Sequence, residues 1–261
     1  MSAIIQTQPT VSLRRRLPLL HLLDPREYLR PSLIALGVGM TIALAARTLW
    51  SAPLWTFTFI VLLTLLPVGV RKWRDDLHRY GGVIMVLSIL VIAQGVHTIE
   101  HIIQWGQYHI LYWTMRQSSG LVSAANAEWV HFTWNWAVLI AIVILIKGGM
   151  RNIWGFLLLW IATAHTLEHT YLFLRYLEVL GELRSMGVTT VTAQGLPGIF
   201  GRDGWLARSL YTSGTPLGSL PWLTTVVRLD VHFWWNMIET ALVLLAGHVL
   251  LRRTPRFYKS L

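Results

Sequence analysis

Two copies of one pentapeptide contain the residues of this sequence that are best suited to chemistry. HTIEH occupies residues 97–101 and HTLEH occupies residues 165–169, each within a long apolar run. Positions i, i+3 and i+4 share one face of a helix, so each copy presents two imidazoles and a carboxylate together. Imidazoles and carboxylates bind transition metals, and a glutamate beside them can act as an acid or base. The pattern predicts a metal site.

A second pair of matching segments, VHFTWN at 130–135 and VHFWWN at 231–236, adds a histidine and an asparagine at i and i+4. The predicted metal ligands are His97, Glu100, His101, His131, His165, Glu168, His169 and His232. The predicted catalytic acid–base residues are Glu100, Glu168 and Glu239, the last lying one turn beyond VHFWWN where the first copy has Val138. Asn135 and Asn236 are predicted to orient the ligands by hydrogen bonding.

The order of these segments predicts an internal repeat. The two HTxEH segments are 68 residues apart and the two VHFxWN segments are 101 residues apart, so the second unit has 33 extra residues in its loop. Both units would be helical hairpins running in the same direction, related by a pseudo-twofold axis along the membrane normal. The spacing H-x-x-E-H also occurs in a class of soluble metalloproteases, where the glutamate is the general base. Nothing else in the chain resembles those enzymes.

The composition is that of an integral membrane protein. Hydrophobic residues make up 54% of the 261 residues and charged residues only 13%, against about a quarter in soluble domains. The chain has no cysteine, which excludes thiolate ligands. Spanning helices need about 17 to 25 apolar residues, and such runs are found at 32–50, 53–70, 81–105, 128–147, 152–176 and 228–251. We therefore expect an all-α polytopic fold with six transmembrane helices and a four-helix core.

The basic residues predict the orientation, because cytoplasmic loops retain lysine and arginine. One side of the predicted membrane holds 15 of the 22 basic residues, namely Arg14, Arg15, Arg16, Arg26, Arg30, Arg71, Lys72, Arg74, Arg79, Lys147, Arg151, Arg252, Arg253, Arg256 and Lys259. Both termini are therefore expected in the cytoplasm, in a bacterial plasma membrane, with the metal site toward the outer face. The net charge of +10 does not form the basic stripe of a nucleic-acid-binding domain, and no nucleic-acid partner is predicted.

The expected organisation has five parts. Residues 1–31 would be a cytoplasmic N-terminus with an interfacial amphipathic helix over 14–30, and 32–70 the first two spans. Residues 81–147 would be the first repeat and 152–251 the second. Its outer loop 177–227 would cover the site, and 252–261 would be a basic cytoplasmic tail.

The donor set favours two divalent ions, with His97, His101 and His131 mainly on one and His165, His169 and His232 mainly on the other, or with the third ligand exchanged between units. Iron or zinc is expected, with copper possible and haem less favoured. We expect a metal-dependent oxidoreductase or hydrolase that acts on a lipid-like or small apolar substrate. Its expected partners are membrane lipid and, as an open alternative, a partner membrane subunit. The alternatives are a non-catalytic metal-handling protein, a haem or redox subunit of a membrane complex, and a purely structural or proton-conducting polar network.

Overall fold

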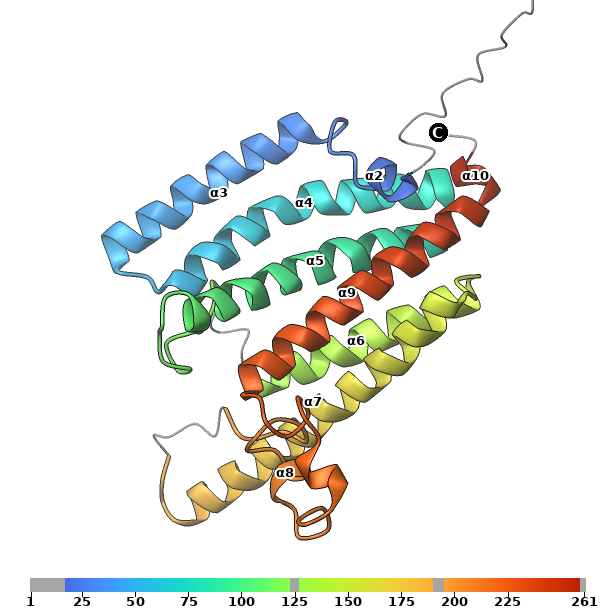
Figure 1. Ribbon diagram of the computed structural model, residues 1–261. Helices are drawn as coiled ribbons and strands as arrows, with labels where there is room; N and C mark the ends of the chain where they lie inside the picture. The colour runs from blue at the N-terminus through green and yellow to red at the C-terminus, as the bar shows by residue number, and fades with distance from the viewer. Residues whose placement is uncertain (1–16, 123–126, 190–194, 259–261) are drawn as a thin grey trace, which may run out of the picture.

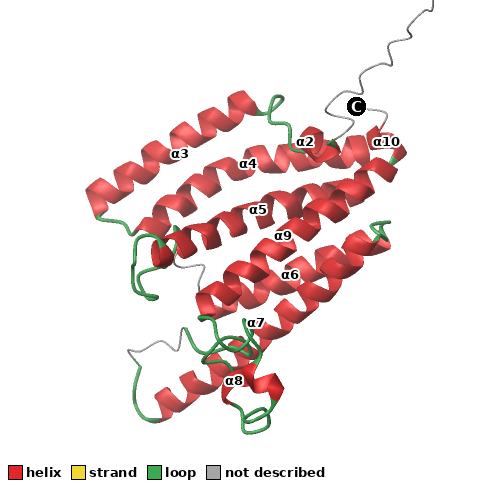
Figure 2. Ribbon diagram, in the orientation of Figure 1, coloured by secondary structure: helices red, strands yellow, loops and turns green. Residues whose placement is uncertain are grey.

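The computed structural model describes residues 17–122, 127–189 and 195–258, and within these ranges it consists of helices and loops (Figure 2). The long helices are α3 (Leu29–Trp50), α4 (Leu54–Tyr80), α5 (Gly82–His109), α6 (Glu128–Lys147), α7 (Ile153–Ser185) and α9 (Arg228–Arg253). The short ones are α2 (Pro18–Leu22), α8 (Trp205–Arg208), the 3-10 helix η2 (Pro216–Ser219) and α10 (Pro255–Tyr258).

The six long helices run side by side and alternate in direction (Figure 1). Helices α5, α9, α7 and α6 close a four-helix core, because α5 packs on α9, α9 on α7, α7 on α6 and α6 on α5. Helices α3 and α4 form an outlying pair that joins this core through α4 and α5. We call the end with α2 and α10 the termini end, and the end with α8 and the connections after α5 and α7 the loop end.

Five of these helices are long and apolar enough to cross a membrane: α3, α4, α5, α6 and α9. This finding is compatible with an integral membrane protein. Helix α7, expected to be the fifth of the six spans, is 33 residues long but is not among the five described helices that meet this criterion. The polar residues of HTLEH lie in the middle of its apolar run and reduce its hydrophobicity, so six spans remain a prediction.

Helix ends depart from the expected boundaries mainly by extension. Helix α4 continues ten residues past the predicted end at 70, to Tyr80, and α7 continues nine past 176, to Ser185. The predicted interfacial helix over 14–30 does not form as one helix within the described residues. Instead α2 is five residues long, and a turn precedes α3. Pro25 explains the break, because a proline disfavours helical conformation in the residue before it.

The core has an apolar half and a polar half. Toward the termini end, buried aliphatic side chains from all four helices pack together, among them Leu87, Ile142, Leu158 and Ala246. Toward the loop end the buried side chains are polar, and include Thr98, His131, His165 and Asn236. Burying a polar layer costs free energy unless each group is hydrogen-bonded or binds a ligand. This layer is therefore the place to look for function.

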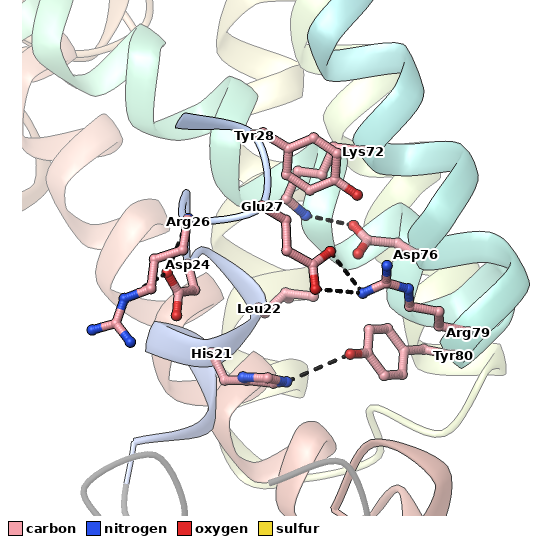
Figure 3. A pocket seen from close by; sticks show the side chains of 10 residues that line it. All are labelled: His21, Leu22, Asp24, Arg26, Glu27, Tyr28, Lys72, Asp76, Arg79 and Tyr80. Carbon is pink, nitrogen blue, oxygen red and sulfur yellow. Dashed lines mark hydrogen bonds and ion pairs between the residues drawn. The ribbon is translucent and has the colours of Figure 1, made fainter. Parts of the chain in front are cut away.

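The termini end is held by ion pairs around a cavity of about 250 Å³ (Figure 3). Arg79 of α4 pairs with Glu27 at 2.8 Å, and Lys72 pairs with Asp76 while donating to Ser88 of α5. The Tyr28 hydroxyl donates to Asp75 at 2.6 Å, and burial, followed by this bond, raises the pKa of Tyr28 above its usual range. These contacts attach the segment before α3 to α4 and balance positive against negative groups.

Candidate metal centre

Six histidine rings from four helices meet in the polar half of the core. They are His97 and His101 of α5, His131 of α6, His165 and His169 of α7, and His232 of α9. Neighbouring rings within one helix have centroids 4.6 Å apart on α5 and 4.9 Å apart on α7. Contacts between helices are equally close, 5.1 Å for His131 and His169 and 4.9 Å for His169 and His232. The structure thus brings together all six histidines that the sequence singled out.

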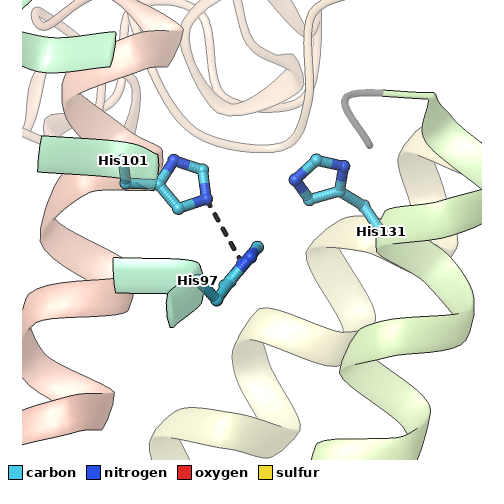
Figure 4. A group of neighbouring side chains, drawn as sticks. All are labelled: His97, His101 and His131. Carbon is cyan, nitrogen blue, oxygen red and sulfur yellow. Dashed lines mark hydrogen bonds between the residues drawn. The ribbon is translucent and has the colours of Figure 1, made fainter. Parts of the chain in front are cut away.

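Three of these histidines form a group that could hold one metal ion (Figure 4). One ring nitrogen from each of His97, His101 and His131 lies within 4.8 Å of the other two. The Nε2 atoms of His97 and His101 are 3.3 Å apart. Two nitrogens bound tetrahedrally to zinc at about 2.0–2.1 Å would be separated by about 3.3 Å, so the α5 pair already has the spacing of two ligands on one ion.

The histidines of α7 leave ring nitrogens without partners. His165 Nε2 and both ring nitrogens of His169 are buried and have no hydrogen-bond partner among the described residues. Each of these rings is about 1% exposed. An unsatisfied buried polar atom typically costs about 1–3 kcal/mol, and a bound metal ion would remove that cost. The donors on α7 therefore fit a metal, although among the described residues the group of three whose nitrogens lie within 4.8 Å of one another is His97, His101 and His131.

On α9, the His232 ring is oriented by its own backbone. His232 Nδ1 lies 3.0 Å from the Arg228 carbonyl, four residues earlier. A ring whose Nδ1–H donates to a carbonyl leaves Nε2 as the free donor for a metal. The Asn135 and Asn236 amides donate to the carbonyls of His131 and His232, at 2.9 and 3.0 Å. Both amides thus contact the backbone of the turn that carries a clustered histidine.

Glu239 contacts one ring of the histidine cluster directly. Its Oε1 lies 3.0 Å from His165 Nδ1, and both side chains are nearly fully buried. Its other oxygen accepts from the Gln94 amide of α5 at 3.3 Å, and Gln94 also donates to Asn236. Carboxylate–imidazole contacts of this kind fix the tautomer of a metal-binding histidine and make it a stronger ligand. Sequence analysis missed Gln94, which is 145 residues from its partner Glu239.

Glu100 and Glu168 accept hydrogen bonds from backbone amides of the loops. Glu100 accepts from the amides of Leu121 and Val122, at 2.8 and 2.9 Å. Glu168 accepts from the amide of Ile199 at 3.0 and 3.1 Å. The structure therefore places these two carboxylates in contact with the loops that follow α5 and α7. The roles predicted for them from the sequence, metal ligand and acid–base residue, stay predictions.

Aromatic side chains enclose the histidines on both sides. Trp134 lies 5.2 Å from His97, and Trp235 stacks on His165 at 5.2 Å. These tryptophans occupy equivalent positions in VHFTWN and VHFWWN. His109 lies outside the cluster and contacts Asp230 at 2.6 Å, which links the loop ends of α5 and α9. Indole rings therefore flank the histidine cluster, and the contact between His109 and Asp230 lies nearer the loops.

Comparisons of the chain with protein-family models, with curated proteins and with solved structures found no match.

Proposed function

We propose that this protein is an integral membrane metalloprotein whose six clustered histidines hold a dinuclear transition-metal centre. The observation that carries the proposal is the set of buried imidazole nitrogens: three gathered within 4.8 Å on α5 and α6, and three others on α7 that lack partners among the described residues. In this proposal His97, His101 and His131 hold one ion. His165, His169 and His232 hold the second.

The donor set limits the metal. Imidazole suits zinc, copper, iron and nickel, whereas magnesium and calcium prefer oxygen ligands. The carboxylate in contact with a histidine is Glu239, and the other two predicted carboxylates bind loop amides. A nitrogen-rich site of this kind supports copper as strongly as the iron or zinc expected from the sequence.

We further propose that the core contains two parallel hairpin repeats, α5–α6 and α7–α9. Support comes from contacts that recur at equivalent positions. Both pairs of histidine and tryptophan are 5.2 Å apart, both asparagines donate to the carbonyl four residues earlier, and both glutamates accept loop amides. Six spans, with α7 as the fifth, follow from this arrangement, because parallel hairpins need four crossings of the core.

The proposed orientation places the termini end in the cytoplasm and the loop end outside. The distribution of lysine and arginine between the two ends supports this orientation. The metal centre, in the half of the core toward the loop end, would then lie near the outer face.

Catalysis is the use of the centre that we favour. A bound transition metal can lower the pKa of water to about 7 or support redox chemistry. Glu239 would orient His165 by accepting a hydrogen bond from its Nδ1–H, and the tryptophans would shield the rings from bulk water. A lipid-like or small apolar substrate would suit a site inside a bundle that has exposed apolar side chains on its surface, such as Leu33, Ile34 and Leu63. Oxidation would follow from iron or copper and hydrolysis from zinc.

Burial of the donors supports a second candidate, a metal-handling or redox protein without a substrate. His165 and His169 are about 1% exposed and His101 is 4% exposed, and the rings contact one another closely. An electron-transfer or storage site needs burial more than it needs an opening for a substrate. A haem or redox subunit of a membrane complex belongs to the same class.

Metal analysis tests the proposal. Wild-type protein purified in detergent from metal-replete cells should contain about two equivalents of iron, copper or zinc, and the double variant His97→Ala, His165→Ala should lose them. The variant His78→Ala, near the termini end of α4, is the control and should retain the metal. A folded wild-type protein without metal would contradict the proposal, and an absorption band of haem would move the assignment to a haem protein.

A further inference from the structure

The loops at the loop end return to the glutamates of the two HTxEH segments. After α5, the amides of Leu121 and Val122 reach both oxygens of Glu100. After α7, the amide of Ile199 reaches both oxygens of Glu168. Both sets of contacts join a loop to the helical turn that carries two of the clustered histidines. The loops lie over 20 residues beyond these glutamates in sequence, so the contacts are tertiary.

A glycine precedes the donor amides in each loop, and neither glycine can be replaced without displacing the carboxylate. A Cβ at Gly120 would lie 2.0 Å from Glu100 Oε1, and a Cβ at Gly198 would lie 2.0 Å from Glu168 Oε1. Gly120 also has a φ of +72°, which disfavours other residues. Gly198 has no such φ, so at this position the close approach alone requires glycine.

Both carboxylates are buried, with 8% exposure for Glu100 and 1% for Glu168. A buried carboxylate is costly unless it is paired or hydrogen-bonded, and bonds from backbone N–H groups to a charged oxygen are among the stronger ones. The loop amides therefore satisfy the glutamates, while the glutamates fix the loops.

The second loop also contacts the walls of the cluster. The Phe200 ring lies 5.8 Å from Trp235, and Trp235 stacks on His165 with an interplanar angle of 8°. Movement of the Gly198–Phe200 segment would disturb this stack. The loop is thus connected to a proposed metal ligand through side chains as well as through Glu168.

We propose that Glu100 and Glu168 are positioning residues that hold the loop segments 120–122 and 198–200 closed over the metal centre, and that release of these segments is the step by which the metal ion enters and leaves. The inference rests on the proposed metal centre. It gives the glutamate of HTxEH a role different from metal ligand or base. The two histidines of the motif would bind the metal, and the glutamate between them would hold the loop that covers the site.

Two variants test the inference by changing the two partners of one contact, Glu168 of α7 and Gly198 of the loop that follows α7. Glu168→Ala removes the acceptor, and Gly198→Ala places a Cβ where the carboxylate of an intact glutamate lies, so that the carboxylate and the loop must separate. Glu182→Ala and Gly181→Ala are matched controls, because Glu182 is exposed and a Cβ at Gly181 meets nothing within 4 Å.

Three quantities are measured on the metal-loaded protein in detergent: metal content, the rate at which excess EDTA removes the metal, and amide hydrogen exchange of the segment 198–200. Both loop variants should retain the wild-type metal content. They should lose metal to EDTA about tenfold faster or more, which corresponds to about 1.4 kcal/mol in the opening equilibrium, and the amides of 198–200 should exchange faster. The controls should behave as wild type in all three measurements.

The outcomes separate the inference from the proposed function. Loss of metal in Glu168→Ala with full retention in Gly198→Ala would identify Glu168 as a ligand and overturn the inference. Unchanged amide exchange and unchanged removal rates in both variants would overturn it as well. A wild-type protein that binds no metal would refute the proposed function and the role of the loops in metal exchange, and amide exchange would still decide whether the glutamates hold the loops. Should Glu168→Ala fail to fold, Gly198→Ala and the milder Glu168→Gln provide the same comparison.

Discussion

At the scale of single residues, three buried glutamates of one polar layer have different partners. Glu100 and Glu168 accept loop amides, and Glu239 contacts an imidazole and the amide of Gln94. The difference also breaks the predicted symmetry. At the equivalent positions of the repeat, Ala162 corresponds to Gln94 and Val138 corresponds to Glu239. These apolar residues cannot form the hydrogen bonds that join Gln94, Glu239 and His165. The two proposed metal positions are therefore chemically unequal.

Glu239→Gln should weaken the binding of one ion and leave the other unchanged. An amide in place of the carboxylate makes His165 a poorer ligand, and loss of such a partner typically lowers metal affinity about 10–100-fold. Isothermal titration of the metal-free protein should show two distinct binding events in wild type, and only one of them should be weakened in the variant. The control Glu182→Gln, on the exposed part of α7, should titrate as wild type. Equal weakening of both events would contradict the inequality of the two positions.

The sequence predicts contacts between residues a few positions apart on one helix. It does not predict contacts that depend on how two helices pack. His97 and His101 share a helix face because they are four residues apart, and the same holds for His165 and His169. Gln94 meets Glu239 only because α5 packs against α9, and nothing in the spacing along the chain indicates that contact. Gly120 and Gly198 were detectable in principle, since SGLV and PGIF both place a glycine before two apolar residues in equivalent loops.

At the scale of helices, the beginnings of α6 and α9 are joined by an ion pair. Arg228 donates to Glu128 at 2.8 Å and to the carbonyl of Leu196 at 2.6 Å. Glu128 is 2% exposed and the Arg228 side chain 22% exposed. The pair holds together two helices that each carry a clustered histidine, His131 and His232, within one turn of the contact.

Arg228→Gln should destabilise the protein more than removal of both charges together. Breaking a buried pair leaves one uncompensated charge and costs about 3–5 kcal/mol, whereas replacing both partners is often nearly neutral. Because Arg228 is partly exposed, we expect a loss of about 3 kcal/mol at the lower end of that range. Denaturant unfolding in detergent of the single variant and of Glu128→Gln, Arg228→Gln measures the difference. An equal loss in both would show that the pair contributes through packing.

Helix α7 shows why the number of spans is harder to predict than the existence of helices. Apolar periodicity and length predict a helix over 152–176, and a helix forms. The residues that make α7 functionally interesting, the histidines and Glu168, are the ones that lower its hydrophobicity. A polar site inside a helix and a strong signal for membrane insertion therefore compete for the same positions.

At the scale of the whole molecule, the side of the membrane on which each loop lies shows whether α7 crosses the membrane. If α7 crosses the membrane, its two ends lie on opposite sides, and Lys147 before it lies on the same side as Arg74 of α4. The chain has no native cysteine, so single cysteines can report the side of each position without background.

In intact cells, an impermeant maleimide should label Tyr211→Cys and leave Lys147→Cys and Arg74→Cys unlabelled until the cells are opened. These positions are exposed, with Tyr211 87% exposed in the loop after α8. The expected pattern follows from cytoplasmic termini and six spans. Labelling of Lys147→Cys and Tyr211→Cys from the same side would show that α7 does not cross.

The three buried imidazole nitrogens of α7 that have no partner within the described part of the chain have a consequence for the amount of protein in the cell. Each unsatisfied buried group costs about 1–3 kcal/mol, and an ion that binds the folded state stabilises it by mass action. A chain made without its metal would therefore be degraded sooner, because proteases act on the unfolded fraction. Cells starved of the correct metal should contain less of this protein at equal rates of synthesis. The half-life of the protein would then report which metal the cell supplies to it.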